Sequence, residues 1–255
     1  MDITARVNEL MVDGQVFCLA TIITSDWPEI IAGTKAIILA DGSLEGEIGS
    51  AQLKLAIRDQ ALAVIKKKKR CMLEIQKGLQ VFFDILTCES SLIVCGAGHI
   101  AVPLARFARA VGFSVTVLDD RSDFAHPSRF PGCTVMAENF TEALRDMALN
   151  SSSYVVVITR GHEHDVDCLL EILPKEAAYV GLIGSRRRVR FVLEWLEKDG
   201  FSRQRLNDVF TPIGIPIGAE SPEEIALSIV AELVCVRRKG DGQARALRSA
   251  VGIEK

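Results

Sequence analysis

A repeated order of apolar strand, loop and helix over the last two thirds of the chain limits the possible folds more than any other feature. The expected strands are Leu92–Cys95, Ser114–Leu118, Tyr154–Ile158 and Ala178–Ile183, and the expected helices are Ile100–Val111, Asp165–Leu173, Arg187–Asp199 and Pro222–Arg238. Continuous apolar strands that alternate with helices indicate a parallel sheet covered by helices on both faces. The sequence therefore predicts an α/β domain in this part of the chain.

A glycine-rich loop directly follows the first of these strands and opens the next helix. The G-x-G-x-x-G/A pattern of dinucleotide-binding folds is matched by Gly96-Ala97-Gly98-His99-Ile100-Ala101. Gly96 permits a tight turn and Gly98 lets the backbone approach a phosphate, while free N–H groups and the helix dipole favour the anion. We therefore predict a Rossmann-like sheet whose ligand contacts Gly96, Ala97, Gly98 and His99. His99 is equally suited to a local hydrogen bond, and a purely structural turn is the alternative for the whole loop.

The first third of the chain has a different pattern, with short apolar β-branched runs and few helical segments. Asp41-Gly42 favours the tight turn of a hairpin, and Ala51–Ile65 has the spacing of an amphipathic helix. We therefore predict a smaller mixed α+β domain over residues 1–88 and the Rossmann-like domain over residues 89–255, with fraying after Gly240. The strands expected in the smaller domain are Val16–Ile23, Ala36–Ala40, Leu44–Ile48 and Leu79–Leu86.

Composition excludes several classes of protein. Of the 255 residues, 49% are hydrophobic and 25% charged, which is typical of a globular protein. The net charge of -3 disfavours binding to nucleic acid, which normally needs a basic surface. We expect no membrane helix and no signal peptide, because no apolar run approaches roughly 20 residues and Met1–Asp13 is charged throughout. Seven cysteines without a CxxC pair indicate reduced thiols and a cytoplasmic protein.

Two acids and an arginine end the second strand of the predicted sheet. Asp119 lies 21 residues after Gly98. Dinucleotide-binding folds place the acid that binds a ribose hydroxyl at a spacing of about 20 residues. Arg121 follows at once and is suited to a 2′-phosphate instead. We therefore include Asp119, Asp120 and Arg121 in the predicted cofactor site.

The loop after the third strand gathers titratable side chains. Two of the four histidines, His162 and His164, lie there with Arg160 and Asp165. Titratable groups at a binding edge favour proton transfer or ligand hydrogen bonding, so His162, His164 and Asp165 are candidate catalytic residues. Arg160 is a candidate ligand contact. A metal at the two histidines would need further ligands, for which only Glu163 and Asp165 are near, and we predict none. A structural role is the third interpretation.

Three arginines follow the fourth strand, after Gly184 and Ser185. Ser185 is suited to cap the next helix, whose first turn would then carry the arginines. Positive charge is unfavourable there because the helix dipole is already positive at this end. The charge therefore suggests an anionic partner, either a phosphate or an acidic surface of a neighbouring chain, with solvated arginines as the alternative. We include Gly184, Ser185 and Arg186 in the predicted cofactor site.

Loops that follow parallel strands emerge at the carboxyl edge of the sheet, where ligands bind in such folds. The four loops are therefore expected to surround one cleft that receives an anionic small molecule. The segments expected around this cleft are Gly96–Gly98, Asp119–Arg121, Arg160–Asp165 and Gly184–Arg188.

Several of these segments resemble, in the same order, the C-terminal Rossmann domain of the XdhC/CoxI family. Members of this family are accessory proteins for xanthine dehydrogenase and related molybdenum hydroxylases. The resemblance covers roughly residues 90–238, and its motifs are Gly96–His99, Val117–Arg121, Thr159–Asp165, Tyr179–Arg186 and Pro212–Ile225. It implies a protein that binds molybdenum cofactor (molybdopterin), assists its sulfuration and delivers it to the apo-enzyme.

The partners that the resemblance implies are a molybdenum hydroxylase, such as xanthine dehydrogenase, and a sulfur-donating cysteine desulfurase. We expect a homodimer as the oligomeric state. The N-terminal part departs from the family at one turn. Where the family usually has Gly-Gly-Gly-Cys-Val-Glu, this chain has Gly49-Ser50-Ala51-Gln52-Leu53-Lys54. Gln52 therefore stands in the place of the thiol.

Three functions are compatible with these residues. The first is an accessory protein for a molybdenum hydroxylase. The second is an NAD(P)-dependent oxidoreductase that binds NAD(P) on the same sheet and uses His162 or His164 as acid or base. The third is a non-catalytic nucleotide-sensing regulator. The residues leave open whether the chain is an enzyme and whether its ligand is molybdenum cofactor or NAD(P).

Overall fold

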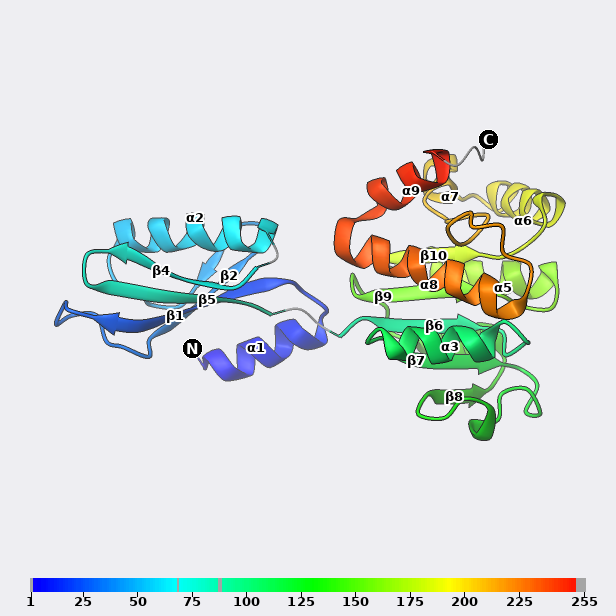
Figure 1. Cartoon of the computed structure of the whole chain (residues 1–255), viewed down its shortest axis with the longest axis horizontal. Coiled ribbons are helices and arrows are strands. Elements are labelled where there is room, and N and C mark those ends of the chain that lie inside the picture. Colours follow the sequence, from blue (N-terminus) through cyan, green and yellow to red (C-terminus); the bar gives the residue numbers. More distant parts are fainter. Residues whose placement is uncertain (1, 68, 87–88, 251–255) are drawn as a thin grey trace. The chain divides into compact units, whose positions relative to one another are not determined.

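The computed structural model describes residues 2–67, 69–86 and 89–250, and it divides into two compact units, residues 1–88 and 89–255 (Figure 1). The first unit contains an antiparallel sheet with helices, and the second contains a parallel sheet with helices on both faces. The expected fold class is therefore confirmed. Among the described residues, no helix combines the length and the apolar character that crossing a membrane requires.

The first unit is built on a five-stranded sheet in the order β3-β2-β1-β5-β4, with every pair antiparallel. Neighbouring residues of a strand point to opposite faces. Cys18 and Ile38 therefore pack with α2, while Phe17 and Ile37 pack with Leu10 of α1. The elements are α1 (Ile3–Val12), β1 (Phe17–Ser25), β2 (Lys35–Leu39), β3 (Leu44–Glu45), α2 (Ala51–Lys67), β4 (Cys71–Gln76) and β5 (Leu79–Leu86).

The second unit is built on a five-stranded parallel sheet in the order β10-β9-β6-β7-β8. Its first part comprises β6 (Ser91–Cys95), α3 (Ala101–Ala110), β7 (Ser114–Asp119), the 3-10 helix Pro127–Arg129, β8 (Thr134–Ala137), α4 (Phe140–Asp146) and β9 (Ser153–Val157). Its second part comprises α5 (His162–Ile172), β10 (Tyr179–Leu182), α6 (Arg186–Lys198), α7 (Arg203–Asn207), α8 (Pro222–Lys239) and α9 (Asp241–Ala250).

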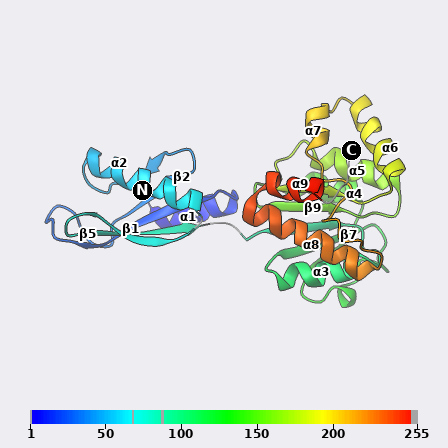
Figure 2. The same cartoon turned by 45° about the horizontal axis from the view of Figure 1, so that its top comes forward.

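Two separate apolar cores cover the two faces of the parallel sheet. One core packs α3 and α8 against alternate strand residues such as Val94 and Val156, and the other packs α4, α5 and α6 against residues such as Ile93 and Val157. Figure 2 shows α3 and α8 together, with α5 and α6 apart from them. The central strands β6 and β9 are buried on both faces, which is why the runs Leu92–Cys95 and Tyr154–Val157 lack polar alternation.

Several elements differ from the sequence expectation. The apolar patterns did not predict α1, β4, β8 or α4. The second hairpin arm was expected at Leu44–Ile48 and ends at Glu45, because Gly46 takes a φ of +121° that a regular strand does not allow. The expectation of fraying after Gly240 was wrong for α9. Ala244 of that helix is fully buried in the core, and Arg245 donates hydrogen bonds to the carbonyl groups of Asn207 and Asp208. Residues 251–255 lie outside the described part.

Candidate functional site

The sheet topology brings the four predicted loops to one edge. β6 lies between β7 and β9, so the loops that follow these two strands flank the glycine-rich loop that follows β6. The fourth loop follows β10, which pairs in parallel with β9. In Figure 1 this edge is the right-hand side of the second unit, where β6 ends. Carboxyl edges of such sheets are where ligands bind.

Gly96 is required where the glycine-rich loop packs against the backbone that follows β9. Its φ of +111° lies in the left-handed region, and a Cβ atom there would lie 2.5 Å from the carbonyl oxygen of Ile158. The Cα atom of Thr159 would lie 3.1 Å from the same Cβ position. The backbone after β9 therefore packs directly against the glycine-rich loop, and only glycine leaves the necessary room.

Gly98, in contrast, faces open space. Apart from its chain neighbours, no described atom lies within 4 Å of the position that a Cβ atom would take. Among the residues that the structure describes, the N–H groups of Gly98, His99 and Ile100 donate no hydrogen bond, and α3 begins at the next residue. The exposed imidazole of His99 also makes no hydrogen bond with these residues. Unpaired amides before a helix are a favourable place for a phosphate.

Asp119 is buried beneath this loop, with 1% of its surface exposed. Its Oδ2 accepts hydrogen bonds from the Ala97 N–H and from Nη2 of Arg121, both at 2.8 Å. Its Oδ1 accepts from Nε of Arg121 at 2.8 Å and from the Arg121 N–H at 3.1 Å. Burial alone would raise the pKa of the Asp119 carboxyl, but these hydrogen bonds outweigh it and the pKa is lowered.

All four acceptor positions of the Asp119 carboxylate are thus occupied by protein donors. A ribose hydroxyl would have to displace one of them. The spacing from Gly98 placed Asp119 at the correct strand end, but spacing carries no information about whether its carboxylate faces a ligand or the loop backbone.

Sequence reasoning missed two residues that hold the loop in place. Nη1 of Arg129 donates to the carbonyl oxygens of Ala97 at 2.9 Å and of Phe124 at 2.5 Å. The guanidinium of Arg121 lies 3.7 Å above the ring centre of Phe124, a cation–π contact. Phe124 and Arg129 belong to the irregular segment between β7 and β8, where no spacing pattern marks them.

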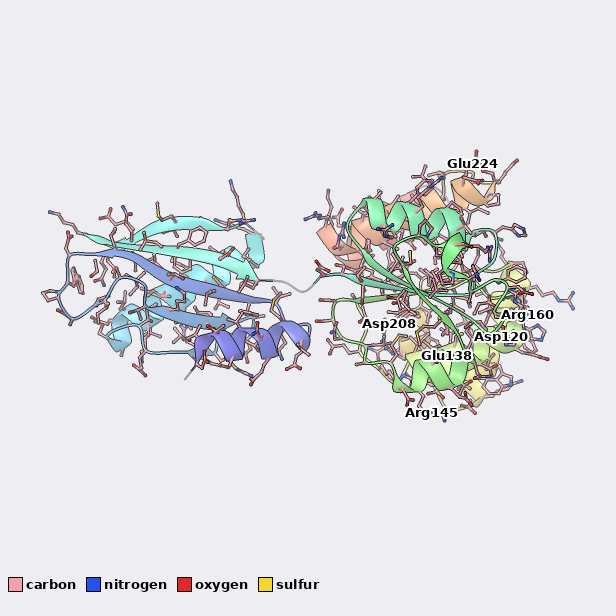
Figure 3. The ribbon with its side chains drawn as sticks, turned by 90° about the horizontal axis from the view of Figure 1, so that it is seen from below. Asp120, Glu138, Arg145, Arg160, Asp208 and Glu224 are labelled. Carbon is pink, nitrogen blue, oxygen red and sulfur yellow. The ribbon has the colours of Figure 1, made fainter. Side chains whose placement is uncertain are left out.

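An ion pair joins the loops on either side of the glycine-rich loop. Arg160, after β9, donates from Nη1 and Nη2 to the two carboxylate oxygens of Asp120, after β7, at 2.5 and 2.8 Å. Figure 3 labels the two residues next to one another. The hydrogen bonds from Arg160 lower the pKa of Asp120 to about 2. Both predicted ligand contacts are therefore paired with each other in this structure, and 40% of the Arg160 side chain is exposed.

Asp165 connects the third and fourth loops. Its carboxylate is fully buried and accepts hydrogen bonds from Oγ1 of Thr159 at 2.6 Å and from Nε of Arg188 at 2.6 Å. Nη2 of Arg188 also donates to the Thr159 carbonyl at 3.0 Å. Asp165, one of the candidate catalytic residues, is thus enclosed by protein partners, and its geometry suits holding the two loops together.

The two candidate histidines point to different neighbours. The structure starts α5 at His162, three residues earlier than expected, so His162 and His164 lie about 200° apart around a helix. The ring of His162 meets Phe191 edge-on at 4.9 Å, whereas the ring of His164 lies 5.5 Å from that of Phe140. No group of three or more potential metal ligands occurs among the described residues.

The fourth loop opens onto a groove. Ser185 is the N-cap of α6 and accepts a hydrogen bond from the Arg188 N–H, as expected from the sequence. Gly184 and Arg186 line a groove of about 450 Å³ between α6 and the segment from α7 to Pro212. Of the predicted cofactor-site residues, these two line the groove, while the glycine-rich loop follows β6, two strands away from β10.

Two parts of the chain match one protein family. Residues 92–233 match the family described as the XdhC Rossmann domain, and residues 10–76 match the one described as the XdhC and CoxI family. The first match alone covers more than half of the chain. The chain belongs to the XdhC and CoxI family. The family suggested by the sequence motifs is thereby confirmed.

Relatives of this XdhC and CoxI family member include two curated proteins. The uncharacterized protein YqeB of Escherichia coli is 26% identical over 95% of this chain and 47% of its own length. A probable xanthine dehydrogenase subunit of Bacillus subtilis is 32% identical over 62% of this chain and 46% of its own length. The chain therefore spans about half the length of the curated relatives it matches.

A solved structure resembles this XdhC and CoxI family member over both of its units. The crystal structure of a xanthine dehydrogenase from Bacillus halodurans matches with a TM-score of 0.67 and 27% sequence identity. The match covers 96% of this chain and 69% of that chain.

Replacement of the two loop glycines by alanine is expected to change stability by different amounts. Gly96→Ala places a Cβ 2.5 Å from the Ile158 carbonyl oxygen in a left-handed conformation, and we expect the unfolding free energy to fall by about 2 kcal/mol or more. Gly98→Ala meets open space, so we expect a change within about 1 kcal/mol. Urea unfolding measures both, and equal losses would contradict the close approach at Gly96.

Asp165→Ala tests the assignment of Asp165 as a connector of loops. Its loss leaves Arg188 and Thr159 without their buried partner, so we expect the unfolding free energy to fall by about 3 kcal/mol. The control is His162→Ala, which removes one exposed aromatic contact and is expected to change stability by less than about 1 kcal/mol. If Asp165→Ala lowered the unfolding free energy as little as the control does, the contacts of Asp165 with Arg188 and Thr159 would not be structural.

The ion pair between Arg160 and Asp120 predicts a pH dependence of stability. The folded-state pKa of Asp120 is about 2 against an ordinary value of 3.8, so its contribution is complete above about pH 4 and is lost as the pH falls through 2. We therefore expect the stability advantage of the wild type over Asp120→Asn to shrink between about pH 4 and about pH 2. In an Arg160→Gln background this dependence should be absent. A difference that stays constant over this range would refute the pairing.

Proposed function

We propose that this chain is an accessory protein for a molybdenum hydroxylase of the xanthine dehydrogenase type. It binds molybdenum cofactor and delivers it to the apo-enzyme. The membership in the XdhC and CoxI family supports this role. So do the matches to one structure named as a xanthine dehydrogenase and to one protein named as a probable subunit of such an enzyme.

The observation that carries the proposal is the set of unpaired amides at Gly98, His99 and Ile100, next to open space and the start of α3. The pterin cofactor carries a phosphate, and amides at a helix N-terminus fit that group. Arg160 lies beside the same loop and is partly exposed. In this role the protein holds the ligand, while the bound cofactor supplies the molybdenum on which the hydroxylase depends.

No observation favours an NAD(P)-dependent oxidoreductase over a carrier. The acid that would bind the ribose, Asp119, has all its acceptor positions filled by Ala97 and Arg121. His162 and His164 pack against Phe191 and Phe140 on different helices, so they do not converge on one reacting group.

The proposal includes no sulfur transfer by a thiol of this chain. Gln52, which replaces the usual family cysteine, is exposed on the first turn of α2. Of the free cysteines among the described residues, Cys95 is nearest in sequence to the glycine-rich loop, and its side chain is fully buried. A cysteine desulfurase would therefore act on the cofactor directly. The cytoplasmic location and the homodimer stay predictions.

The test is retention and transfer of the cofactor. Purified protein mixed with molybdenum cofactor is expected to co-elute with it in gel filtration and to activate an apo-xanthine dehydrogenase. Gly98→Asp adds a negative charge at the open amides, and we expect both retention and transfer to fall at least about tenfold.

The matched control is Gly242→Asp, which adds the same charge in α9, where a Cβ also meets open space. It should retain and transfer the cofactor as the wild type does. No co-elution of the wild type, or transfer by Gly98→Asp at the wild-type level, would refute the proposed function.

A further inference from the structure

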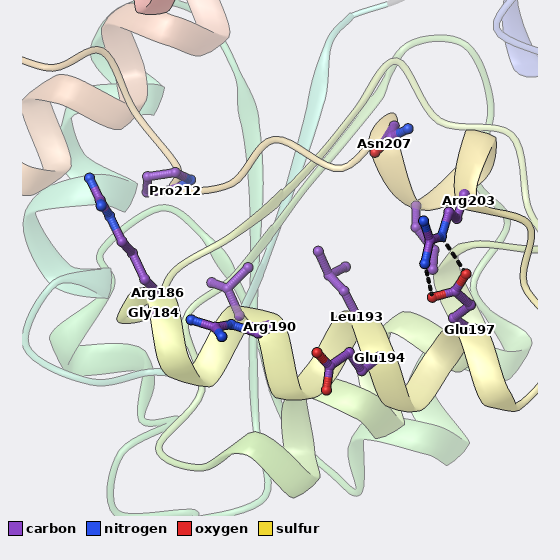
Figure 4. A pocket seen from close by; sticks show the side chains of 11 residues that line it. Gly184, Arg186, Arg190, Leu193, Glu194, Glu197, Arg203, Asn207 and Pro212 are labelled. Atoms are coloured by element: carbon purple, nitrogen blue, oxygen red, sulfur yellow. Dashed lines mark hydrogen bonds and ion pairs between the residues drawn. The ribbon is translucent and has the colours of Figure 1, made fainter. Parts of the chain in front are cut away.

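The groove along α6 is a second place at the carboxyl edge where a small molecule fits. Its volume of about 450 Å³ lies within the roughly 300–1,000 Å³ of small-molecule sites. One wall is α6, and the other is the segment from α7 to Pro212 (Figure 4). It is lined at β10's end by Gly184, whereas the unpaired amides of the glycine-rich loop follow β6, two strands away.

Two arginines lie at the Gly184 end of the groove. Arg186 and Arg190 are one helical turn apart on α6 and both line the groove. Neither forms an ion pair within the part of the chain that the structure describes. Arg188 differs from them because it is paired with the buried Asp165. Two guanidinium groups without an ion-pair partner in the described part of the chain favour an anionic group such as a phosphate, and Arg186 also lies at the positive end of the α6 dipole.

The other half of the groove is acidic. Glu194 follows Arg190 by one further turn of α6, lines the groove and has no ion-pair partner among the described residues. Glu197, next along the wall, is paired with Arg203 at 2.5 Å. Figure 4 shows Arg186 beside Pro212 and the pair of Glu197 with Arg203 at the opposite end. An ionised carboxylate only accepts hydrogen bonds, so this half favours a ligand that presents N–H donors.

The floor between the two ends is apolar. Val189 and Leu193 come from α6, and Leu206 and Pro212 come from the opposite wall. Along α6, the distance from Arg186 to Glu194 is about 12 Å at a rise of 1.5 Å per residue. A flat ring system that carries a phosphate spans such a length, with its ring on the apolar floor.

We infer that this groove is a binding site for a guanine nucleotide. Arg186 and Arg190 bind the phosphate, the ring lies on Leu193 and Leu206, and Glu194 accepts hydrogen bonds from the ring N–H and amino groups. Guanine presents these adjacent donors, whereas adenine places an acceptor nitrogen beside its amino group. The site is separate from the glycine-rich loop, so the inference stands or falls independently of the cofactor-delivery role.

The test uses guanosine monophosphate as probe and isothermal titration calorimetry on the full chain. We expect saturable binding to the wild type, weaker binding of adenosine monophosphate, and weaker binding of guanosine, which lacks the phosphate. Arg190→Gln should lower the affinity for guanosine monophosphate at least about tenfold, because charge-assisted hydrogen bonds to the phosphate are lost. Glu194→Gln should remove the preference for guanosine monophosphate over adenosine monophosphate.

Arg187→Gln is the matched control for charge. Arg187 lies on the same first turn of α6 but is not among the residues that line the groove. It should change the affinity less than about twofold at physiological salt, where exposed charges are screened. Equal weakening by Arg187→Gln and Arg190→Gln would mean non-specific attraction and would overturn the inference. So would the absence of binding to the wild type, or equal binding of the two nucleotides.

Gly98→Asp separates this inference from the proposed function. Guanosine monophosphate that binds in the groove should bind this variant with unchanged affinity. Loss of binding in Gly98→Asp with no loss in Arg190→Gln would place the nucleotide at the glycine-rich loop and overturn the groove site. Because the readout is direct binding, failure of cofactor transfer leaves this outcome unaffected.

Discussion

The buried carboxylate of Asp119 is the constraint on which the candidate site depends. An ionised acid beneath the surface is tolerated only when its acceptor positions are filled, and here the Ala97 N–H and the Arg121 side chain fill them. The same bonds fix the glycine-rich loop against the end of β7. Arg129 donates a further hydrogen bond to the carbonyl oxygen of Ala97. The amides that follow are thereby oriented before any ligand arrives, which reduces the ordering cost of binding.

Three acids at or after the strand ends of this edge are neutralised internally, whereas several donors are left exposed. Asp119 is paired with Arg121, Asp120 with Arg160, and Asp165 with Arg188. The groups that remain are the backbone amides before α3 and the unpaired arginines at the start of α6. This arrangement explains how a chain with a net charge of -3 has an edge suited to anions. Local pairing, and not total charge, decides which ligands such a surface accepts.

The sequence predicted the sheet and the position of its ligand-binding edge, because apolar runs mark the buried strands and topology brings their following loops together. It did not predict what the loop acids do. Asp119 and Asp165 were placed among ligand-binding and catalytic candidates, and the structure shows both carboxylates surrounded by protein donors. The direction of a side chain depends on tertiary partners such as Arg188, which lies 23 residues from Asp165 and carries no local signal.

The arginines at the start of α6 show how a locally unfavourable charge can indicate a ligand. Each positive charge on the first turn of a helix costs about 0.3–1 kcal/mol against the dipole. Ser185 offsets part of this by capping the helix, and Asp165 neutralises Arg188. No internal acid does so for Arg186 among the described residues. An anion in the groove would remove the penalty and gain two charge-assisted contacts without moving the backbone. The unpaired amides of the glycine-rich loop have the same property, since their partners must come from solvent or ligand.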